Sequence, residues 1–325
     1  MTSPVTVVVP TRDRVEVFGQ TLRAILGQQA VDLRVLAVDD GSTSTDALAL
    51  QQLADPRVEV LRNERSLGPS AARNRGIAAA TTRWIAFCDD DDVWAPDKLC
   101  TQLAALEGSG ARWSCTGSLT VSPSLAILGH RRAPARADVL ADLLAFNVVP
   151  GGGSSVVVDA ELLAQVDGFD ESMNRAEDWD LWIRLAVRSP VAAVDRPLVG
   201  YRVWPGSESL DTVGMAEGHA EVVRRYAPLA AEHGVALDEA AVAKYLAKQE
   251  LRAGRRAAAA RRFAAMPLRE AAGGWARASL AMVAPDLVDR VGNARSARAV
   301  PAAWREEARP WLAALVTADA TLDPA

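Results

Sequence analysis

Short apolar runs alternate with amphipathic segments through the first third of the chain, which is the pattern of βα units in a largely parallel sheet. Val5–Val9 predicts a buried strand ended by Pro10, and Val15–Gln28 predicts a helix because its apolar residues recur at helical spacing. By the same criteria we expect further strands at residues 33–38, 58–61 and 84–88, and helices at residues 70–80 and 96–106. The sequence therefore predicts an α/β fold.

Periodicity is weaker beyond residue 106. We expect a strand at residues 155–158, a helix at 178–187 and two short strands at 192–194 and 198–203. After Trp204 the composition shifts to Ala- and Arg-rich segments such as Leu251–Met266, which are typical of helices. We therefore divide the chain near Leu210 into an α/β domain of residues 1–210 and a helical region of residues 211–325.

Charge and cysteine content restrict the class of protein. The formal net charge of -5 argues against a nucleic-acid partner, which normally selects a basic excess. Three cysteines without CxxC spacing indicate neither a disulfide framework nor a zinc ribbon. We find neither a signal-peptide pattern at Met1 nor a run approaching roughly 18 apolar residues. A soluble protein of the cytoplasm is expected.

Arginines are concentrated between Leu251 and Arg262. They are Arg252, Arg255, Arg256, Arg261 and Arg262. The favoured interpretation is a solvated helix face. The alternative is peripheral contact with the inner face of a membrane, or with a lipid-linked acceptor.

Polar residues stand where three of the predicted strands end. They are Pro10-Thr11-Arg12, Asp39-Asp40 and Asp89-Asp90-Asp91-Asp92. Because ligands of open α/β sheets collect beyond the carboxyl ends of strands, these residues are candidates for a binding site. Four consecutive carboxylates repel one another, and a divalent cation would neutralise them. Oxygen ligands suit Mg²⁺ or Mn²⁺, whereas a solvated acidic turn before Pro96 is the alternative.

Two further segments carry candidate chemistry. Between Asn63 and Gly76, glycine and small residues enter a predicted helix, so the backbone there can approach an anion, and Arg73 or Arg75 can reach it. Glu177-Asp178 begins another helix. These carboxylates either cap that helix or supply a general base that takes a proton from a hydroxyl.

Seven pieces of the sequence together resemble the family 2 glycosyltransferases, inverting enzymes of the GT-A fold. They are Val7–Arg12, Val38–Ser42, Gly68–Gly76, Phe87–Trp94, Gly168–Glu171, Glu177–Trp182 and Tyr201-Arg202. They occur in the family's order and cover the first two thirds of the chain. The resemblance implies a nucleotide-sugar-binding mixed sheet flanked by helices over residues 1–210, with a helical C-terminal extension.

The resemblance also implies roles for individual residues. Thr11, Asp39 and Asp40 would hold the nucleotide base, and Arg73 would lie near the diphosphate or nucleoside. Asp89 and Asp91 match the family's DxD motif, in which the first acid contacts ribose or sugar and the second the metal. Asp92 is a further metal ligand, and Asp178 matches the catalytic base. Residues expected to complete the nucleotide-sugar site are Pro10, Arg12, Asp90, Glu177 and Trp204.

The implied reaction transfers a sugar from a nucleotide diphosphate sugar to an acceptor hydroxyl on a cell-surface glycan, glycolipid or natural product. Mg²⁺ or Mn²⁺ would offset charge on the leaving group, and Asp178 would deprotonate the acceptor. One departure concerns Trp204, because many relatives carry a histidine shortly after the Tyr-Arg pair. Trp204 is expected either to pack in the core or to stack on a sugar.

Two other functions compete with this interpretation. A sugar-phosphate nucleotidyltransferase would carry a Gly-rich loop after its first strand, and Pro10-Thr11-Arg12-Asp13-Arg14 has no glycine. A catalytically silent nucleotide-sugar-binding protein is disfavoured by the acids at Asp89–Asp92 and Glu177-Asp178.

Overall fold

A nine-stranded mixed sheet forms the centre of the computed structural model, which describes residues 4–43, 55–173, 175–204, 211–265 and 294–320. The strand order is β3-β2-β1-β4-β8-β6-β9-β5, with β7 paired to β6. The strands are β1 (Val5–Thr11), β2 (Leu33–Asp39), β3 (Val58–Arg62), β4 (Trp84–Phe87), β5 (Val93–Trp94), β6 (Trp113–Val121), β7 (Ile127–Arg131), β8 (Val156–Asp159) and β9 (Val191–Arg202). The four strands β3, β2, β1 and β4 are parallel, as the sequence predicts.

The second half of the sheet changes direction. Strand β8 runs antiparallel to both β4 and β6, whereas β9 runs parallel to β6 and β5 antiparallel to β9. The two short strands expected at residues 192–194 and 198–203 are one continuous strand, β9, with irregular register beside Gly117. Strand β6 was not predicted because it is buried along nearly its whole length and rich in Ser, Thr and Cys, so it shows neither alternation nor an apolar run.

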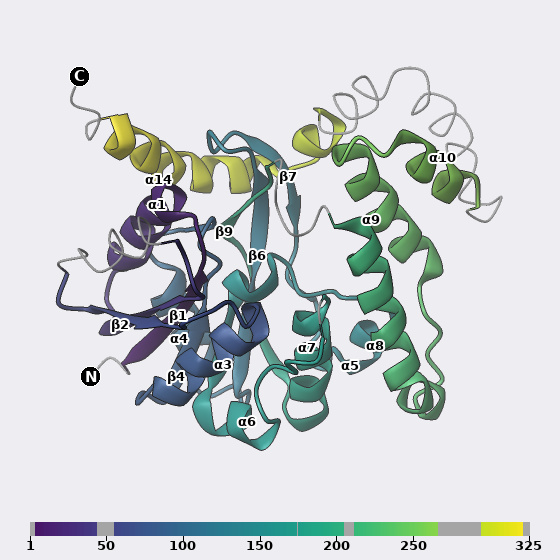
Figure 1. Ribbon diagram of the computed structural model, residues 1–325, viewed down its shortest axis with the longest axis horizontal. Coiled ribbons are helices and arrows are strands. Elements are labelled where there is room, and N and C mark those ends of the chain that lie inside the picture. Colours follow the sequence, from purple (N-terminus) through teal and green to yellow (C-terminus); the bar gives the residue numbers. More distant parts are fainter. Residues whose placement is uncertain (1–3, 44–54, 174, 205–210, 266–293, 321–325) are drawn as a thin grey trace.

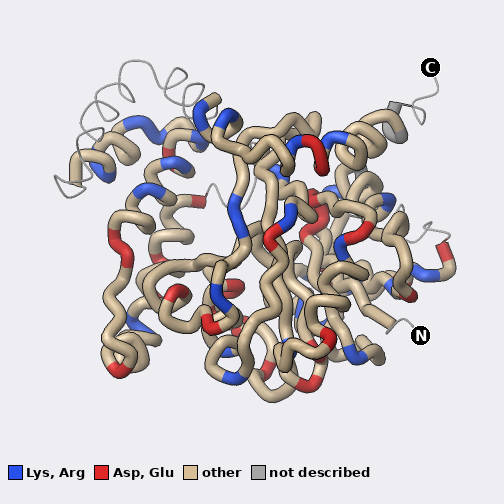
Figure 2. Tube along the Cα trace, turned by 180° about the vertical axis from the view of Figure 1, so that it is seen from behind, with Lys and Arg blue, Asp and Glu red and all other residues tan. Residues whose placement is uncertain are grey.

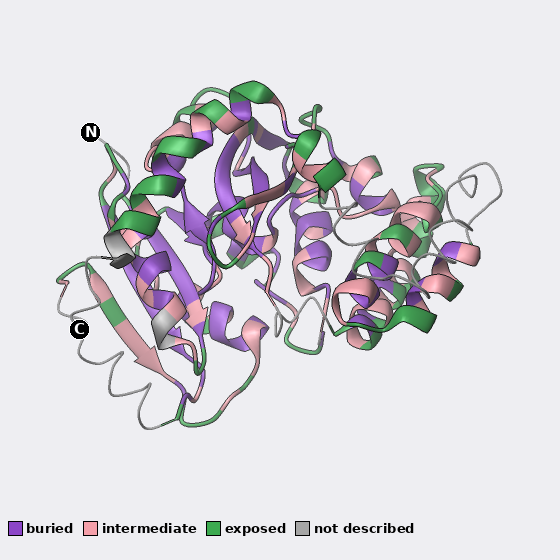
Figure 3. Ribbon diagram, turned by 90° about the horizontal axis from the view of Figure 1, so that it is seen from above, coloured by how far each residue is buried: buried purple, intermediate pink, exposed green. Residues whose placement is uncertain are grey.

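Helices cover both faces of the sheet (Figure 3). Successive side chains of β1 point to opposite faces of the sheet, so the core has two parts. Val7 and Val9 pack with Phe18 on one face, and Val8 packs with Ala72 on the other. The helices of this part are α1 (Val15–Leu26), α3 (Pro69–Ala79), α4 (Lys98–Leu106), α5 (Leu140–Ala145), α6 (Ala160–Gln165) and α7 (Glu177–Arg188), with a 3₁₀ turn η1 (Gly152–Ser155). Apolar residues of these helices close the core, and α4 and α7 also bury the charged residues Lys98 and Asp180.

The C-terminal helices lie in two places (Figure 1). Helices α8 (Thr212–Glu232), α9 (Glu239–Arg252) and α10 (Arg256–Ala264) stand together beside α5 and α7. Helix α14 (Ala302–Ala320) lies across α1 and β9, where Trp304 and Trp311 are buried. The expected helical C-terminal extension is therefore present, while the domain boundary near Leu210 stays a prediction.

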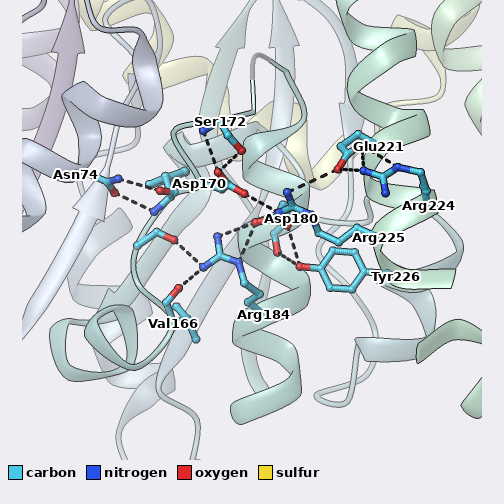
Figure 4. A network of polar contacts seen from close by, with 12 residues as sticks. Asn74, Val166, Asp170, Ser172, Asp180, Arg184, Glu221, Arg224, Arg225 and Tyr226 are labelled. Carbon is cyan, nitrogen blue, oxygen red and sulfur yellow. Dashed lines mark hydrogen bonds and ion pairs between the residues drawn. The ribbon is translucent and has the colours of Figure 1, made fainter. Parts of the chain in front are cut away.

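A buried ion-pair network fastens α8 to α7 (Figure 4). Asp180 of α7 has no solvent exposure, and its carboxylate accepts hydrogen bonds from Arg184, Arg225 and Tyr226 at 2.8 Å each. Arg225 also pairs with Asp170 at 2.7 Å. This network fixes the helix that begins with the candidate residues Glu177 and Asp178.

Basic and acidic residues alternate along the whole trace, and Lys and Arg recur along the C-terminal helices (Figure 2). Within the described part of the chain, no helix combines the length and the apolar character needed to cross a bilayer.

Candidate functional site

The polar segments that follow β1, β2 and β4 meet at one edge of the sheet. Register explains this, because Thr11 pairs with Asp39, and Val8 pairs with Phe87, just before the acidic run. Here lies a pocket of about 530 Å³, which we call the strand-end pocket. Eight predicted site residues line it: Pro10, Thr11, Arg12, Asp40, Arg73, Asp89, Asp90 and Asp91.

Arg73 connects this pocket to helix α7. Its guanidinium donates to Asp89 Oδ1 at 2.7 Å and to Glu177 Oε1 at 3.0 Å. Burial lowers the pKa of Arg73, but the charges of Asp89 and Glu177 outweigh it and raise the pKa overall. The guanidinium thus stays charged and holds the end of β4 against the start of α7. Glu177 itself does not line the strand-end pocket.

The side chains of the four consecutive aspartates have different interaction partners. Asp89 pairs with Arg73, while Asp90 accepts from Arg14 at 3.1 Å. Asp91 accepts from Trp204 Nε1 at 2.8 Å, and the guanidinium carbon of Arg14 lies 5.1 Å from the centre of the Trp204 ring. Trp204 therefore contacts Asp91, which lines the pocket, but Trp204 itself does not line the pocket.

Asp92 lies beneath the pocket, not on its wall. It has no solvent exposure, and its Oδ1 accepts the backbone N–H of Arg202 at 2.8 Å, which attaches the acidic turn to β9. The assignment of Asp92 as a metal ligand stays a prediction.

Burial raises the pKa of two aspartates in the acidic turn. It raises the pKa of Asp90 to about 6 against the opposing charge of Arg14. Burial is also the main reason why the pKa of Asp91 is raised. The hydrogen bond from Trp204 lowers this pKa, and the charge of Asp89 raises it further. A positive charge placed beside Asp91 would offset this cost of burial.

The two acids after β2 organise the surrounding loops. Asp39 is buried and bonds to Arg62 and the backbone N–H of Ser42. Asp40 accepts hydrogen bonds from Asn63, Ser66 and the N–H groups of Leu67 and Gly68. Although burial raises the pKa of Asp40, these bonds lower it overall. Asp40 thereby shapes the loop that forms one wall of the strand-end pocket, whereas Asp39 does not line it.

Asp178 lines a different cavity of about 280 Å³, which we call the helix-side pocket because α7, α8 and α9 contribute to it. Its Oδ1 accepts the N–H of Trp179 at 2.7 Å, and its Oδ2 lies 3.4 Å from Asn147 Nδ2. Burial raises the pKa of Asp178; the Trp179 hydrogen bond and Arg73 oppose it, and the charge of Asp89 adds to it. A carboxylate with a raised pKa is a stronger base than an exposed aspartate.

The two pockets approach each other beside Gly152, which lines the helix-side pocket. A Cβ placed on this glycine would lie 3.8 Å from Asp178 Oδ2 and 3.9 Å from Asp89 Oδ2. Tyr201 lines both pockets. The sequence signal for this junction is the run Gly151-Gly152-Gly153, in which the first two residues have φ of +65° and +53°. We did not predict a role for this run.

Comparison with known proteins supports a glycosyltransferase relationship. The sequence profile described as glycosyl transferase family 2 matches residues 6–144. Succinoglycan biosynthesis protein ExoO of Rhizobium meliloti is 35% identical over 108 residues, which are 33% of this chain and 31% of that protein. The β-1,3-glucosyltransferase WfgD of Escherichia coli, named for UDP-Glc and α-D-GlcNAc-diphosphoundecaprenol, is 25% identical over 59% of this chain and 73% of its own. The chain spans only 31–34% of the length of ExoO and of two Rickettsia glycosyltransferases.

Solved structures share the fold. S. aureus TarS 1-349 in complex with UDP is similar over 96% of this chain and 91% of its own, with a TM-score of 0.55 and 18% identity. The mannosyltransferase PcManGT from Pyrobaculum calidifontis, in complex with GDP-Man and Mn²⁺, is similar over 92% of this chain and 86% of its own, with a TM-score of 0.56 and 20% identity. The predicted GT-A fold is thus confirmed, and the predicted family resemblance is confirmed over residues 6–144, where the glycosyl transferase family 2 profile matches this chain.

Proposed function

We propose that the chain is an inverting, metal-assisted glycosyltransferase that moves a sugar from a nucleotide diphosphate sugar to an acceptor hydroxyl on a cell-surface glycan. The observation that carries this proposal is the approach of the two pockets to each other beside Gly152, with Asp89 and Asp178 each within 4 Å of one point. A donor in the strand-end pocket and an acceptor in the helix-side pocket would react there. The name of ExoO, which refers to succinoglycan biosynthesis, supports the acceptor class.

The donor half of the proposal places the nucleoside diphosphate in the strand-end pocket. Thr11, Asp39 and Asp40 are proposed to position the base, and Arg73 to lie near the diphosphate. Among the described residues, four arginines and five aspartates line the pocket, so the formal charge of this lining is slightly negative before a ligand enters. Because the diphosphate adds further negative charge, donor binding should require a cation.

Asp91 fits a metal ligand best among the aspartates. It lines the pocket, its side chain is 11% exposed, and burial raises its pKa. Mg²⁺ and Mn²⁺ can be held by one or two carboxylates together with substrate phosphates, so no closed cage is needed. Among the described residues, no group of three metal-ligating side chains is present. A bound cation would offset charge on the departing nucleoside diphosphate.

On the acceptor side, we propose that Asp178 removes the proton from the attacking hydroxyl. Its raised pKa strengthens it as a base, and Asn147 and the Trp179 N–H orient its two oxygens. Attack from the face opposite the leaving group inverts the anomeric carbon. Asp89 is proposed to contact the ribose or transferred sugar on the donor side of Gly152.

Substitution of Asp178→Asn tests the proposal, because the amide preserves shape but cannot accept the proton. We expect sugar transfer to fall by about 10²-fold or more, while the Kd for nucleoside diphosphate with Mn²⁺ stays unchanged. The control is Asp142→Asn, which changes a partly exposed carboxylate on α5. Retained transfer in Asp178→Asn would exclude the assigned base. Donor binding without transfer in the native protein would instead favour the catalytically silent binding protein.

A further inference from the structure

One wall of the helix-side pocket comes from the C-terminal helix α9, whose Arg252 the sequence assigned to a solvated face or, as the alternative, to contact with a membrane or a lipid-linked acceptor. Tyr245, Lys248, Gln249 and Arg252 all line this pocket. Their spacing of three, four and seven residues puts them on one face of the helix. Arg131, at the end of β7, lines the same pocket from the sheet side. The Ala/Arg-rich region therefore contributes directly to the cavity that contains Asp178.

Cationic side chains outnumber carboxylates among the described residues that line this cavity. Arg131, Lys248 and Arg252 line it, and Asp178 is the only carboxylate among its lining residues in the described part of the chain. Arg131 donates to the carbonyl oxygen of Asn147 at 2.6 Å, and Arg252 donates to Gln249 Oε1 at 3.2 Å. Both acceptors are neutral, so these hydrogen bonds leave the charge of each guanidinium uncompensated. The charges of Arg131 and Arg252 therefore favour an anionic ligand over a neutral one.

The cations and Asp178 differ in depth. Arg131 and Lys248 are exposed and Arg252 is partly exposed, whereas Asp178 adjoins Gly152 at the junction with the strand-end pocket. A ligand that spans the cavity would therefore place its anionic group among the cations and its hydroxyl near Asp178. Guanidinium groups bind phosphate oxygens through two parallel hydrogen bonds, and Lys adds a compact charge.

We infer that the helix-side pocket binds an acceptor that carries a phosphate or diphosphate group, held by Arg131, Lys248 and Arg252. This inference rests on the proposed function, because it names the substrate class of the acceptor side. The anion can belong to a lipid-linked sugar or to a soluble sugar phosphate, since both present the same chemistry to the cations. The proposed function assigns the nucleotide diphosphate sugar to the strand-end pocket, so the inference concerns the acceptor alone.

Calorimetric titration of the full chain tests the inference. The protein is first saturated with Mn²⁺ and the nucleoside diphosphate that binds most tightly, so that the strand-end pocket is filled. It is then titrated with glucose 1-phosphate, with decyl phosphate below its micellar concentration and with neutral octyl glucoside. The native protein is compared with the double variant Lys248→Gln/Arg252→Gln and with the control Lys244→Gln, which changes an exposed residue of α9 outside the pocket.

We expect at least one phosphate probe to bind the native protein and the control equally, and the double variant about tenfold or more weakly. Binding of both phosphate probes would indicate recognition of the phosphate alone, and binding of decyl phosphate only would indicate a lipid-linked acceptor. Equal binding in the double variant, no phosphate binding, or tighter binding of octyl glucoside would overturn the inference. The first titration separates the two proposals, because absent nucleoside diphosphate binding would count against the proposed function alone.

Discussion

Gly152 determines how closely the two halves of the site can approach each other. Its backbone has φ of +53°, and its missing side chain leaves space beside the oxygens of Asp89 and Asp178. A methyl group at 3.8–3.9 Å would touch both carboxylates without a hard clash, so it would occupy the space that the reacting groups need. The residue is thus proposed to matter for reaction geometry more than for folding.

The substitution Gly152→Ala should therefore lower the rate of sugar transfer by about tenfold to a hundredfold. Left-handed backbone strain should also cost about 1 kcal/mol of folding stability. The matched control is Gly108→Ala, because Gly108 has φ of +72° and no heavy atom within 4 Å of the added Cβ. Steady-state rates and urea unfolding of both variants separate the effects. Equal transfer rates in the two variants would show that the junction does not limit catalysis.

The raised pKa of Asp178 makes a prediction about pH. Burial disfavours its charged form, so its pKa lies above the ordinary value of 3.8. A base must be ionised to accept a proton, and activity should therefore be full above this raised pKa and fall as pH decreases through it. The acidic limb of kcat should lie above pH 3.8, measured at saturating donor and constant free Mn²⁺. The limb should be absent from the residual kcat of Asp178→Asn, and a limb at the same pH in that variant would contradict the assignment.

Candidate site residues could be predicted from the sequence where they directly follow strands that are recognisable as short apolar runs. The acids after β2 and β4 and the segment after β1 meet at one sheet edge, as expected of parallel neighbours. Their individual contacts could not be predicted, because consecutive residues of a turn point in different directions. Thus Asp91 lines the pocket, whereas Asp92 bonds to the backbone of β9.

At the scale of elements, helix α7 depends on a buried charge cluster. Asp180 balances Arg184 and Arg225 from two different helices, and it has no exposed surface. Removing one member of a buried cluster leaves the remaining charges without compensation.

The variant Asp180→Ala should lose about 3–5 kcal/mol of unfolding free energy, measured by urea denaturation at neutral pH. Glu59→Ala is the matched control, because Glu59 pairs with Arg34 and their side chains are 50% and 55% exposed, so the loss should be below about 1 kcal/mol. Similar losses in both variants would mean that the Asp180 cluster contributes no more than a surface pair.

Elements with a strong hydrophobic period were predicted correctly, and those without one were missed. The strands β1, β2 and β4 are short apolar runs between turns, and the sequence indicates each of them. Strand β6 is buried on both faces but contains Ser114, Thr116 and Ser118, so its polarity conceals it. Sheet order in the antiparallel half depends on long-range pairing that local patterns do not encode.

At the scale of the whole molecule, the helix-side pocket is assembled from segments distant in sequence. Arg131 comes from β7, Asp178 from α7 and Arg252 from α9. No motif connects these positions, so the sequence predicted Asp178 without its surroundings. The C-terminal helices, interpreted from composition as a solvated face, also supply a wall of this pocket.

The arrangement of two pockets around Gly152 makes a direct prediction about ligand placement. A nucleoside diphosphate should occupy the strand-end pocket with its terminal phosphate toward Gly152, and Mn²⁺ should join that phosphate to Asp91. A crystal structure of the chain with nucleoside diphosphate and Mn²⁺, with anomalous scattering to locate the metal, measures both. Metal density beside Asp91 and the diphosphate would agree with the proposed reaction. A nucleotide bound elsewhere, or a diphosphate in the strand-end pocket with no metal near Asp91, would contradict it.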